Sequence, residues 1–233
     1  MQVAALRETV AEFGRALAAG YESGLAPLYE SITHWQAAWP PQQAADLPVV
    51  LDAALRNSRS RVYWNTRAYL PKEVLLELAA FAPEVINMAF GRLFNESTEL
   101  GERLSGFVFY LDEAFEEMRR SRRHTRRAHP SHYHADYRAP SLYCALRLPA
   151  THAYFEPTVY LSALRRLRAP NIEPVADASR FAKSVRVAMT FLGRDEGVGD
   201  AHRARLLPGD YTGTSALLAS EYFRFLADDK SSS

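Results

Sequence analysis

Apolar residues recur every three or four positions along almost the whole chain, and this period constrains the fold more than any other feature. In residues 98–118, for example, Leu100, Leu104, Phe107, Leu111 and Met118 fall on one face of a helix. The same spacing marks residues 3–17, 25–39, 48–55, 71–81, 83–93, 141–148, 157–167, 174–192 and 215–226, and a short helix is expected around residue 202. The sequence therefore predicts a predominantly α, multi-helix globular fold.

Two short segments differ from this helical pattern. SRSRVYWNTRAYL (58–70) and HAYFEP (152–157) hold the aromatic and β-branched residues typical of extended chain, so one small β element is predicted near residues 60–70 and 151–156. The 233 residues are enough to bury a substantial core. We expect a single helical domain over residues 1–227, which could subdivide near residues 119–140. The polar end, DDKSSS (228–233), is expected to be a disordered tail.

Several classes of protein are excluded by composition and missing motifs. No apolar run reaches 18 residues, so no membrane span is expected, and the amphipathic amino terminus does not resemble a signal peptide; a cytoplasmic protein is the default. The single cysteine, Cys144, cannot form an internal disulfide and is expected to be a buried structural thiol. GxxxxGK[ST], GxSxG and GxGxxG are all missing. We therefore expect a protein without enzymatic activity or cofactor.

The charges are strongly polarised along the chain, although the net charge is only +1. Residues 1–118 carry 9 basic and 16 acidic side chains, a net charge of −7, whereas residues 119–233 carry 19 and 11, a net charge of +8. Only three of the 28 basic residues are lysines. The basic half is therefore rich in guanidinium groups, which can form paired hydrogen bonds to phosphate and can stack on bases.

The densest positive charge lies in the stretch RRSRRHTRR (119–127), where six arginines occur without an acidic residue. We call this set the arginine tract; its members are Arg119, Arg120, Arg122, Arg123, Arg126 and Arg127. Such a cluster gains affinity for nucleic acid from counterion release at phosphates, without sequence specificity. An acidic protein surface would serve equally well. The simplest alternative is a solvated helix end, where cations also favour the helix dipole.

The residues that follow, AHPSHYHADYR (128–138), permit three interpretations. Tyr133, His134, Tyr137 and Arg138 offer stacking faces and hydrogen-bond donors suited to exposed bases, and would supply the specific part of a nucleic-acid site. The set His129, His132, His134 and Asp136 could instead bind a metal in a hydrolase, although no second motif completes such a site. The third interpretation is a structural turn held by histidine and tyrosine hydrogen bonds. Trp35, Trp39 and Trp64 are expected in the core rather than in a pocket.

Three segments resemble a known family. AYLPKEVLLELAAFAPEVINMAFGRLFNES (68–97), HYHADYRAPSLYCALRLP (132–149) and HWQAAW (34–39) are similar to the region that precedes the AAA+ motor in McrB-like proteins, over about residues 25–227. McrB-like proteins are the nucleotide-driven subunits of type IV modification-dependent restriction and related anti-phage systems. The resemblance implies a specificity or sensor module that selects DNA, commonly modified DNA, for a motor and a separate nuclease subunit.

The chain departs from that family in one respect, because it contains no Walker motif. Ring assembly and nucleotide hydrolysis are therefore not carried over, and the family supplies no base-reading residue that maps onto this sequence. The sequence as a whole predicts a recognition module for nucleic acid, with modified DNA as the expected target, within a defence system. Its alternatives are a domain that docks an acidic protein and a metal-dependent hydrolase.

Overall fold

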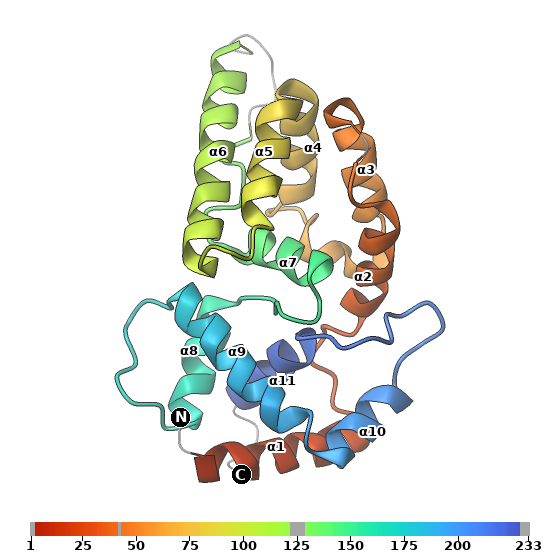
Figure 1. Cartoon of the computed structure of the whole chain (residues 1–233), viewed down its shortest axis with the longest axis vertical. Helices are drawn as coiled ribbons and strands as arrows, with labels where there is room; N and C mark the ends of the chain where they lie inside the picture. Colours follow the sequence, from red (N-terminus) through yellow and green to blue (C-terminus); the bar gives the residue numbers. More distant parts are fainter. Residues whose placement is uncertain (1–2, 42, 122–128, 229–233) are drawn as a thin grey trace.

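The computed structural model describes residues 3–41, 43–121 and 129–228, and within these ranges the chain is helical and has no β-strand. Figure 1 shows the arrangement of the helices. The elements are α1 (Val3–Ala18), α2 (Pro27–Ala38), α3 (Leu47–Ala54), α4 (Pro71–Phe81), α5 (Pro83–Leu93), α6 (Leu100–Ser121), α7 (Arg138–Arg147), α8 (Pro157–Arg166), α9 (Ala178–Leu192), α10 (Glu196–Ala204) and α11 (Leu217–Ala227), with short 3₁₀ helices η1 (Ala44–Asp46) and η2 (Ser58–Tyr63). The prediction of a predominantly α fold is confirmed.

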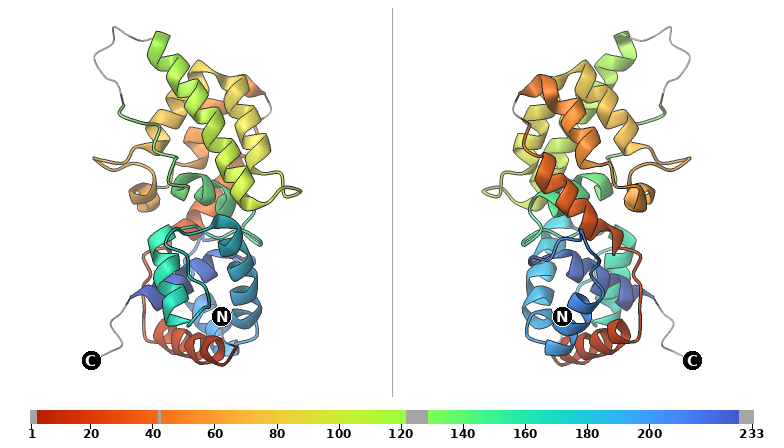
Figure 2. Two further views of the ribbon diagram at one scale, coloured as in Figure 1. Left: turned by 90° about the vertical axis from the view of Figure 1, so that its left-hand side faces the viewer. Right: turned by 90° about the vertical axis from the view of Figure 1, so that its right-hand side faces the viewer.

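The helices form two groups that lie one above the other (Figures 1 and 2). The upper group contains α2 to α7, in which α6 packs on α5 and α2 packs on α3 and α7. The lower group contains α1 and α8 to α11, in which α1 packs on α10 and α8 packs on α11. The chain therefore enters the lower group twice, at its beginning and again after α7.

The starts of the helices follow from local sequence. Proline occupies the first helical position of α4, α5 and α8, where its missing N–H costs nothing and its fixed φ suits the helix. Asp195 caps α10 by accepting a hydrogen bond from the backbone N–H of Val198 at 3.0 Å. Asp177 caps α9 in the same way, and α9 therefore begins at Ala178, four residues later than the start predicted at Pro174.

The small β element predicted near residues 60–70 and 151–156 does not form. Residues 58–63 are the 3₁₀ helix η2, and residues 152–156 form an irregular segment without a neighbouring strand. Two backbone groups of this segment bond to side chains instead. The N–H of Phe155 donates to Ser141 Oγ at 3.0 Å, and the carbonyl of Tyr154 accepts from Ser220 Oγ at 3.0 Å. Aromatic and β-branched composition indicates extended chain, but it does not supply a pairing partner.

One continuous hydrophobic core runs through both groups. In α6, the predicted stripe is confirmed, because Leu104, Phe107 and Leu111 are fully buried. Helix α6 packs on α5 within the upper group and touches α9 of the lower group, so it links the two. No helix in the described parts of the chain is both long and apolar enough to cross a membrane.

The chain crosses between the groups through the segments that join α1 to α2 and α7 to α8 (Figure 1). At the two ends of the stretch 119–140, where the sequence allowed a subdivision, residues 119–121 belong to α6 and residues 138–140 to α7, and these two helices contact each other. Both groups share this core, and the single helical domain over residues 1–227 stays a prediction. The tail predicted for residues 228–233 lies outside the described residues, except for Asp228.

Candidate functional site

The segment from residue 129 to residue 138 leads into α7 and is anchored by two buried histidines. His132 is 3% exposed and His134 is 0% exposed. Next to them, Tyr133 and Tyr137 adopt φ angles of 66° and 65°. The left-handed region costs a residue with a side chain about 1–2 kcal/mol, and such strained residues concentrate at functional sites. The buried histidines must therefore hold this backbone in an unfavourable conformation.

Hydrogen-bond partners assign the tautomer of both histidine rings. The Nδ1 atom of His132 accepts the backbone N–H of His134 at 3.1 Å, so its Nε2–H donates to Asp112 of α6 at 2.8 Å. The ring of His134 donates from Nδ1 to the carbonyl of His132 and accepts from the Tyr143 hydroxyl at 3.0 Å. Burial, helped by the nearby His132, lowers the pKa of His134 to about 3, so this ring is neutral at pH 7.

These two histidines therefore hold a structural turn, which was one of the three interpretations of this segment. The prediction that His134 contacts nucleic acid must be corrected for the same reason. Its side chain has no exposed surface, and both ring nitrogens are already used within the protein. His134 can position the residues on either side of it, but neither of its ring nitrogens is left to bind a ligand.

The neighbouring tyrosines and Arg138 form a partly exposed surface. The guanidinium carbon of Arg138 lies 4.5 Å from the ring centroid of Tyr69, and the rings of Tyr69 and Tyr133 are 6.0 Å apart in an edge-to-face arrangement. All three side chains are partly exposed. We call Tyr69, Tyr133 and Arg138 the aromatic surface; Tyr137, also partly exposed, precedes Arg138 at the start of α7. Arg138 also pairs with Asp136 at 2.8 Å.

The arginine tract begins on the last turn of α6. Arg119 pairs with Glu116 at 3.0 Å, and its guanidinium carbon lies 5.8 Å from the centroid of the Phe115 ring. Arg120 is exposed. The other four members of the tract, Arg122, Arg123, Arg126 and Arg127, lie outside the described residues. Two of the described cations of the predicted site, Arg119 and Arg138, therefore already have carboxylate partners.

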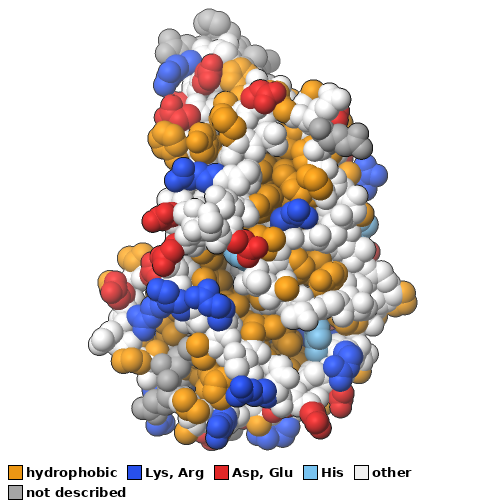
Figure 3. Space-filling view, in the orientation of Figure 1, with side chains coloured by type: hydrophobic (Ala, Val, Ile, Leu, Met, Phe, Trp, Pro, Cys, Tyr) orange, Lys and Arg blue, Asp and Glu red, His pale blue; other side chains and the backbone are white. Residues whose placement is uncertain are grey.

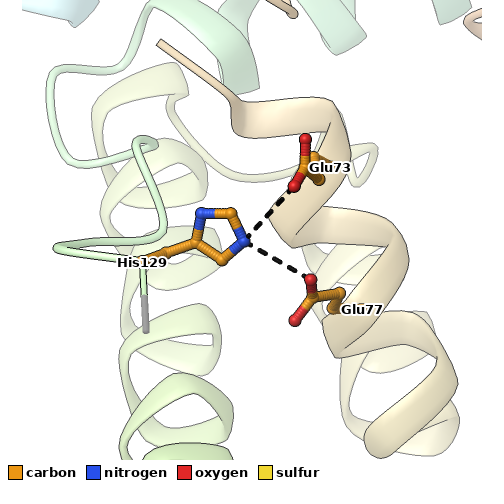
Figure 4. Close-up of side chains that lie close together, drawn as sticks. All are labelled: Glu73, Glu77 and His129. Atoms are coloured by element: carbon orange, nitrogen blue, oxygen red, sulfur yellow. Dashed lines mark hydrogen bonds and ion pairs between the residues drawn. The ribbon is translucent and has the colours of Figure 1, made fainter. Parts of the chain in front are cut away.

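The four residues of the predicted metal cluster do not converge on one point. His132 faces Asp112, His134 faces Tyr143, and Asp136 faces Arg138. His129 turns toward α4 instead, where its Nε2 lies 3.7 Å from Glu73 and 3.4 Å from Glu77 (Figure 4). The hydrolase interpretation that used His129, His132, His134 and Asp136 together is not supported by this geometry.

The group around His129 has the donor atoms of a divalent metal site. One ligand atom from each of Glu73, Glu77 and His129 lies within 4.8 Å of the others. An imidazole and two carboxylates suit Zn²⁺, Fe²⁺ or Mn²⁺, with room for water at the open positions. The side chains also contact one another directly, because the Nε2 of His129 is within hydrogen-bond distance of Glu77 at 3.4 Å and lies 3.7 Å from Glu73. Direct hydrogen bonding explains their approach without a metal ion.

Sequence reasoning missed four residues of this region. Tyr69 stacks under Arg138 although the two are 69 positions apart in the chain, and no sequence pattern links them. Asp112 accepts from His132 although its own side chain is 60% exposed, and no spacing in the sequence links the two residues. Glu73 and Glu77 carried a usable signal, since residues four apart on a helix share a face.

The remaining candidate residues lie in the core, as expected. Trp35, Trp39 and Trp64 are 0%, 9% and 2% exposed, and the Trp35 ring stacks on Tyr143 with 5.7 Å between centroids. Cys144 is buried, and its burial raises the pKa of the thiol to about 12. A thiol that stays protonated at neutral pH is a poor nucleophile.

Comparisons with protein families, with curated proteins and with solved structures gave no match to this chain.

Proposed function

We propose that this protein recognises nucleic acid through the arginine tract and the aromatic surface. The observation that carries the proposal is the position of Arg138, which stacks on Tyr69 beside Tyr133 a short distance along the chain from the tract. Phosphate contacts give affinity without specificity, whereas aromatic rings and guanidinium planes bind exposed bases. The two kinds of group follow one another in a segment of 20 residues, from 119 to 138.

Each residue has a distinct role in this proposal. The arginines of the tract contact phosphates, and Arg138, Tyr133 and Tyr137 contact bases. His134 contacts no ligand but holds the two tyrosines in their left-handed conformation. Because stacking requires unpaired faces, the preferred ligand is single-stranded DNA or a base extruded from a duplex.

The first test measures binding to a labelled DNA duplex, by fluorescence anisotropy, between about 50 and 200 mM salt. We expect log K to fall steeply with log salt, by about 0.9 for each phosphate contact. Replacing Arg122 and Arg126 by Gln should weaken binding and lower this slope by about 2. Arg165 and Arg194, which are exposed in the lower group, provide a matched control when both are replaced by Gln. Binding that ignores salt, or that the control weakens equally, would refute the proposal.

The second test separates specificity from affinity. Tyr133→Ala should weaken binding to single-stranded DNA by about 1–3 kcal/mol, the usual contribution of one stacked base, and leave the salt slope unchanged. A panel of unmodified, cytosine-methylated and single-stranded oligonucleotides then shows whether the protein distinguishes modified DNA. Equal affinity for all three, unaffected by Tyr133→Ala, would remove the specific part of the proposal.

A second candidate function is docking on an acidic protein surface. It is favoured by the ion pairs of Arg119 with Glu116 and of Arg138 with Asp136, because they show that this region accepts carboxylates. Charge reversal at Arg122 and Arg126 distinguishes the two functions. If the partner is an acidic protein, these substitutions abolish binding of that protein. In that case neither the wild type nor the variant binds DNA.

We also propose that the protein acts in a McrB-like restriction or anti-phage system, together with an AAA+ motor and a nuclease subunit. This part rests on the sequence resemblance alone. Co-expression of the protein with the products of neighbouring genes, followed by affinity purification, tests it. Recovery of a nucleotide-hydrolysing subunit supports the proposal, and phage restriction that is unchanged when this gene is deleted contradicts it.

A further inference from the structure

A cavity of about 720 Å³ lies where the two groups of helices meet. Its walls come from residues 96–100 and the first turn of α6, from residues 150–152, and from α9. Figure 3 shows this face, with lysine and arginine side chains over α9 and carboxylates over the start of α6 around a hollow. The volume is in the range of pockets that hold small molecules. None of the residues discussed above for nucleic-acid binding lines it.

Arg103 of α6 lies at the inner end of this cavity and is 1% exposed. A buried guanidinium normally pairs with a carboxylate, because an uncompensated buried charge is very unfavourable. No carboxylate of the described residues lies within ion-pair distance of Arg103. Its only side-chain hydrogen bond in the described chain joins Nη2 to His152 Nε2, and its Nε has no partner. An arginine in this state can accept an anionic ligand.

The bond to His152 orients the guanidinium without neutralising it. Arginine only donates, so His152 must accept at Nε2 and carry its proton on Nδ1, which lies 2.7 Å from Thr151 Oγ1. Thr151 in turn donates to Glu96 at 3.1 Å. Burial and the nearby Arg103 lower the pKa of His152 to about 4, so the ring is neutral at pH 7. The charge of Arg103 is therefore left for a ligand.

The rim of the cavity adds further positive charge. Lys183 and Arg186 are exposed and lie one turn apart on α9, so both can reach the same group. Two carboxylates, Glu96 and Glu99, also line the cavity and would repel an anion. The three cations outnumber them. Apolar walls complete the lining and suit a non-polar part of the ligand; they are Leu100, Ala182, Val185 and Met189.

We propose that this cavity binds a small phosphorylated molecule, with the phosphate on Arg103. A phosphate has three oxygens and nearly two negative charges, so it can satisfy Arg103, Lys183 and Arg186 together. A carboxylate has two oxygens and one charge, and it would meet the same repulsion from Glu96 and Glu99. The apolar wall receives the organic part of the molecule. This site is separate from the nucleic-acid surface proposed above.

Calorimetric titration with inorganic phosphate, pyrophosphate and AMP at constant ionic strength tests the proposal, with acetate as a carboxylate probe. We expect saturable binding of AMP that is at least about tenfold tighter than that of acetate, which corresponds to about 1.4 kcal/mol. Acetate that binds as tightly as phosphate, or no saturable binding of any phosphate probe up to about 10 mM, would overturn it.

Two variants connect binding to the named residues. Arg103→Met should weaken AMP binding at least about tenfold, and it should also raise the melting temperature of the ligand-free protein, because it removes an unpaired buried charge. The double variant Lys183→Gln with Arg186→Gln changes only exposed side chains, so it remains informative if Arg103→Met does not fold. It should also weaken binding about tenfold. Unchanged AMP affinity in the double variant would contradict the proposal.

Controls separate this site from the arginine tract, which could also attract phosphate. The variant with Gln at 122 and 126 should bind AMP as tightly as the wild type, and so should the variant with Gln at 165 and 194. Conversely, the double variant at 183 and 186 should retain DNA binding. If the substitutions at 122 and 126 abolish AMP binding, the phosphate binds at the tract and the cavity proposal fails.

Discussion

At the scale of single residues, the most consequential group for stability is the carboxylate of Glu221 on α11. It is 0% exposed and is bonded by Arg205 through two nitrogens, at 2.6 and 2.7 Å. It also accepts from Tyr29 at 2.8 Å and from Ser23 at 2.7 Å. Every lone-pair direction of this carboxylate is used, which is the condition for burying a charge at acceptable cost.

Glu221→Ala should reduce the free energy of unfolding by about 3–5 kcal/mol, because it leaves the charge of Arg205 without its partner. Urea unfolding followed by circular dichroism measures the change. The matched control is Glu8→Ala, which alters an exposed carboxylate on α1 and should change stability by less than about 0.5 kcal/mol. Similar values for both variants would show that the buried network contributes little.

Three histidines make stability depend on pH. Burial lowers the pKa of His134 to about 3 and those of His152 and His202 to about 4, against 6.5 in the unfolded chain. The unfolded chain therefore binds more protons below pH 6.5. The stabilisation is complete above about pH 6.5 and is lost as the pH falls from there toward the folded values.

We expect His134 alone to contribute a loss of about 1.4 kcal/mol per pH unit between about pH 6 and 4. His152 and His202 should contribute less, since both rings are partly exposed. His134→Gln cannot titrate and should reduce the slope, whereas His34→Gln, which changes a 42% exposed ring, should not. Urea midpoints measured at pH 7, 6 and 5 test this. A slope that is the same in wild type and His134→Gln would disprove the assignment.

At the scale of elements, helix ends are set by local backbone chemistry. Helix α1 ends in a Schellman motif, in which Tyr21 N–H bonds to the carbonyl of Ala16 at 2.8 Å and Gly20 N–H bonds to that of Leu17 at 3.0 Å. Gly20 has a φ of 89°, which only glycine adopts at little cost. Gly20 follows the last apolar residue of the stripe, and a glycine at that position predicts the end of the helix.

Gly20→Ala should destabilise the protein by about 1 kcal/mol. A Cβ at this position would contact nothing within 4 Å, so the whole effect comes from the backbone. Gly91→Ala provides the matched control, since it also meets open space but lies inside α5 with ordinary helical geometry. That substitution should stabilise by about 0.5–1 kcal/mol. Thermal unfolding of both variants should show shifts of opposite sign; shifts of the same sign would contradict the argument.

At the scale of the whole molecule, the two groups of helices are joined by polar contacts as well as by the common core. Arg224 of α11 donates to the Tyr63 hydroxyl of η2 at 3.4 Å, and Glu221 of α11 accepts from the Tyr29 hydroxyl of α2 at 2.8 Å. The N–H of Tyr211 donates to the carbonyl of Tyr29 in α2 at 3.1 Å. Separating the groups would expose these partners together with apolar core.

We therefore expect both groups to unfold in one transition. The three tryptophans all belong to the upper group or its loops, whereas circular dichroism reports on every helix. Urea curves followed by tryptophan fluorescence and by circular dichroism should have the same midpoint. Two separate midpoints would mean that the groups behave as independent domains and that the contacts of Arg224 and Glu221 couple them only weakly.

The sequence alone determined most of the elements, because helix period, proline starts and aspartate caps act over a few residues. Two kinds of local signal carried these predictions. Spacing gave the stripe of Leu104, Phe107 and Leu111, and proline marked the helix starts at 71, 83 and 157. Helix α9 is the exception, because it begins after Asp177 and not at Pro174. The cause is again local, since the side chain of Asp177 caps the first turn.

Only the tertiary structure decided which distant residues meet. Arg138 stacks on Tyr69, His129 turns to Glu73 and Glu77, and Arg103 is buried beside His152, and each of these contacts joins segments that carry no shared pattern. The exposure of His134 was decided in the same way. Local preferences fix the conformation of a segment, but the environment of a polar side chain depends on how the helices pack, and packing joins residues far apart in the chain.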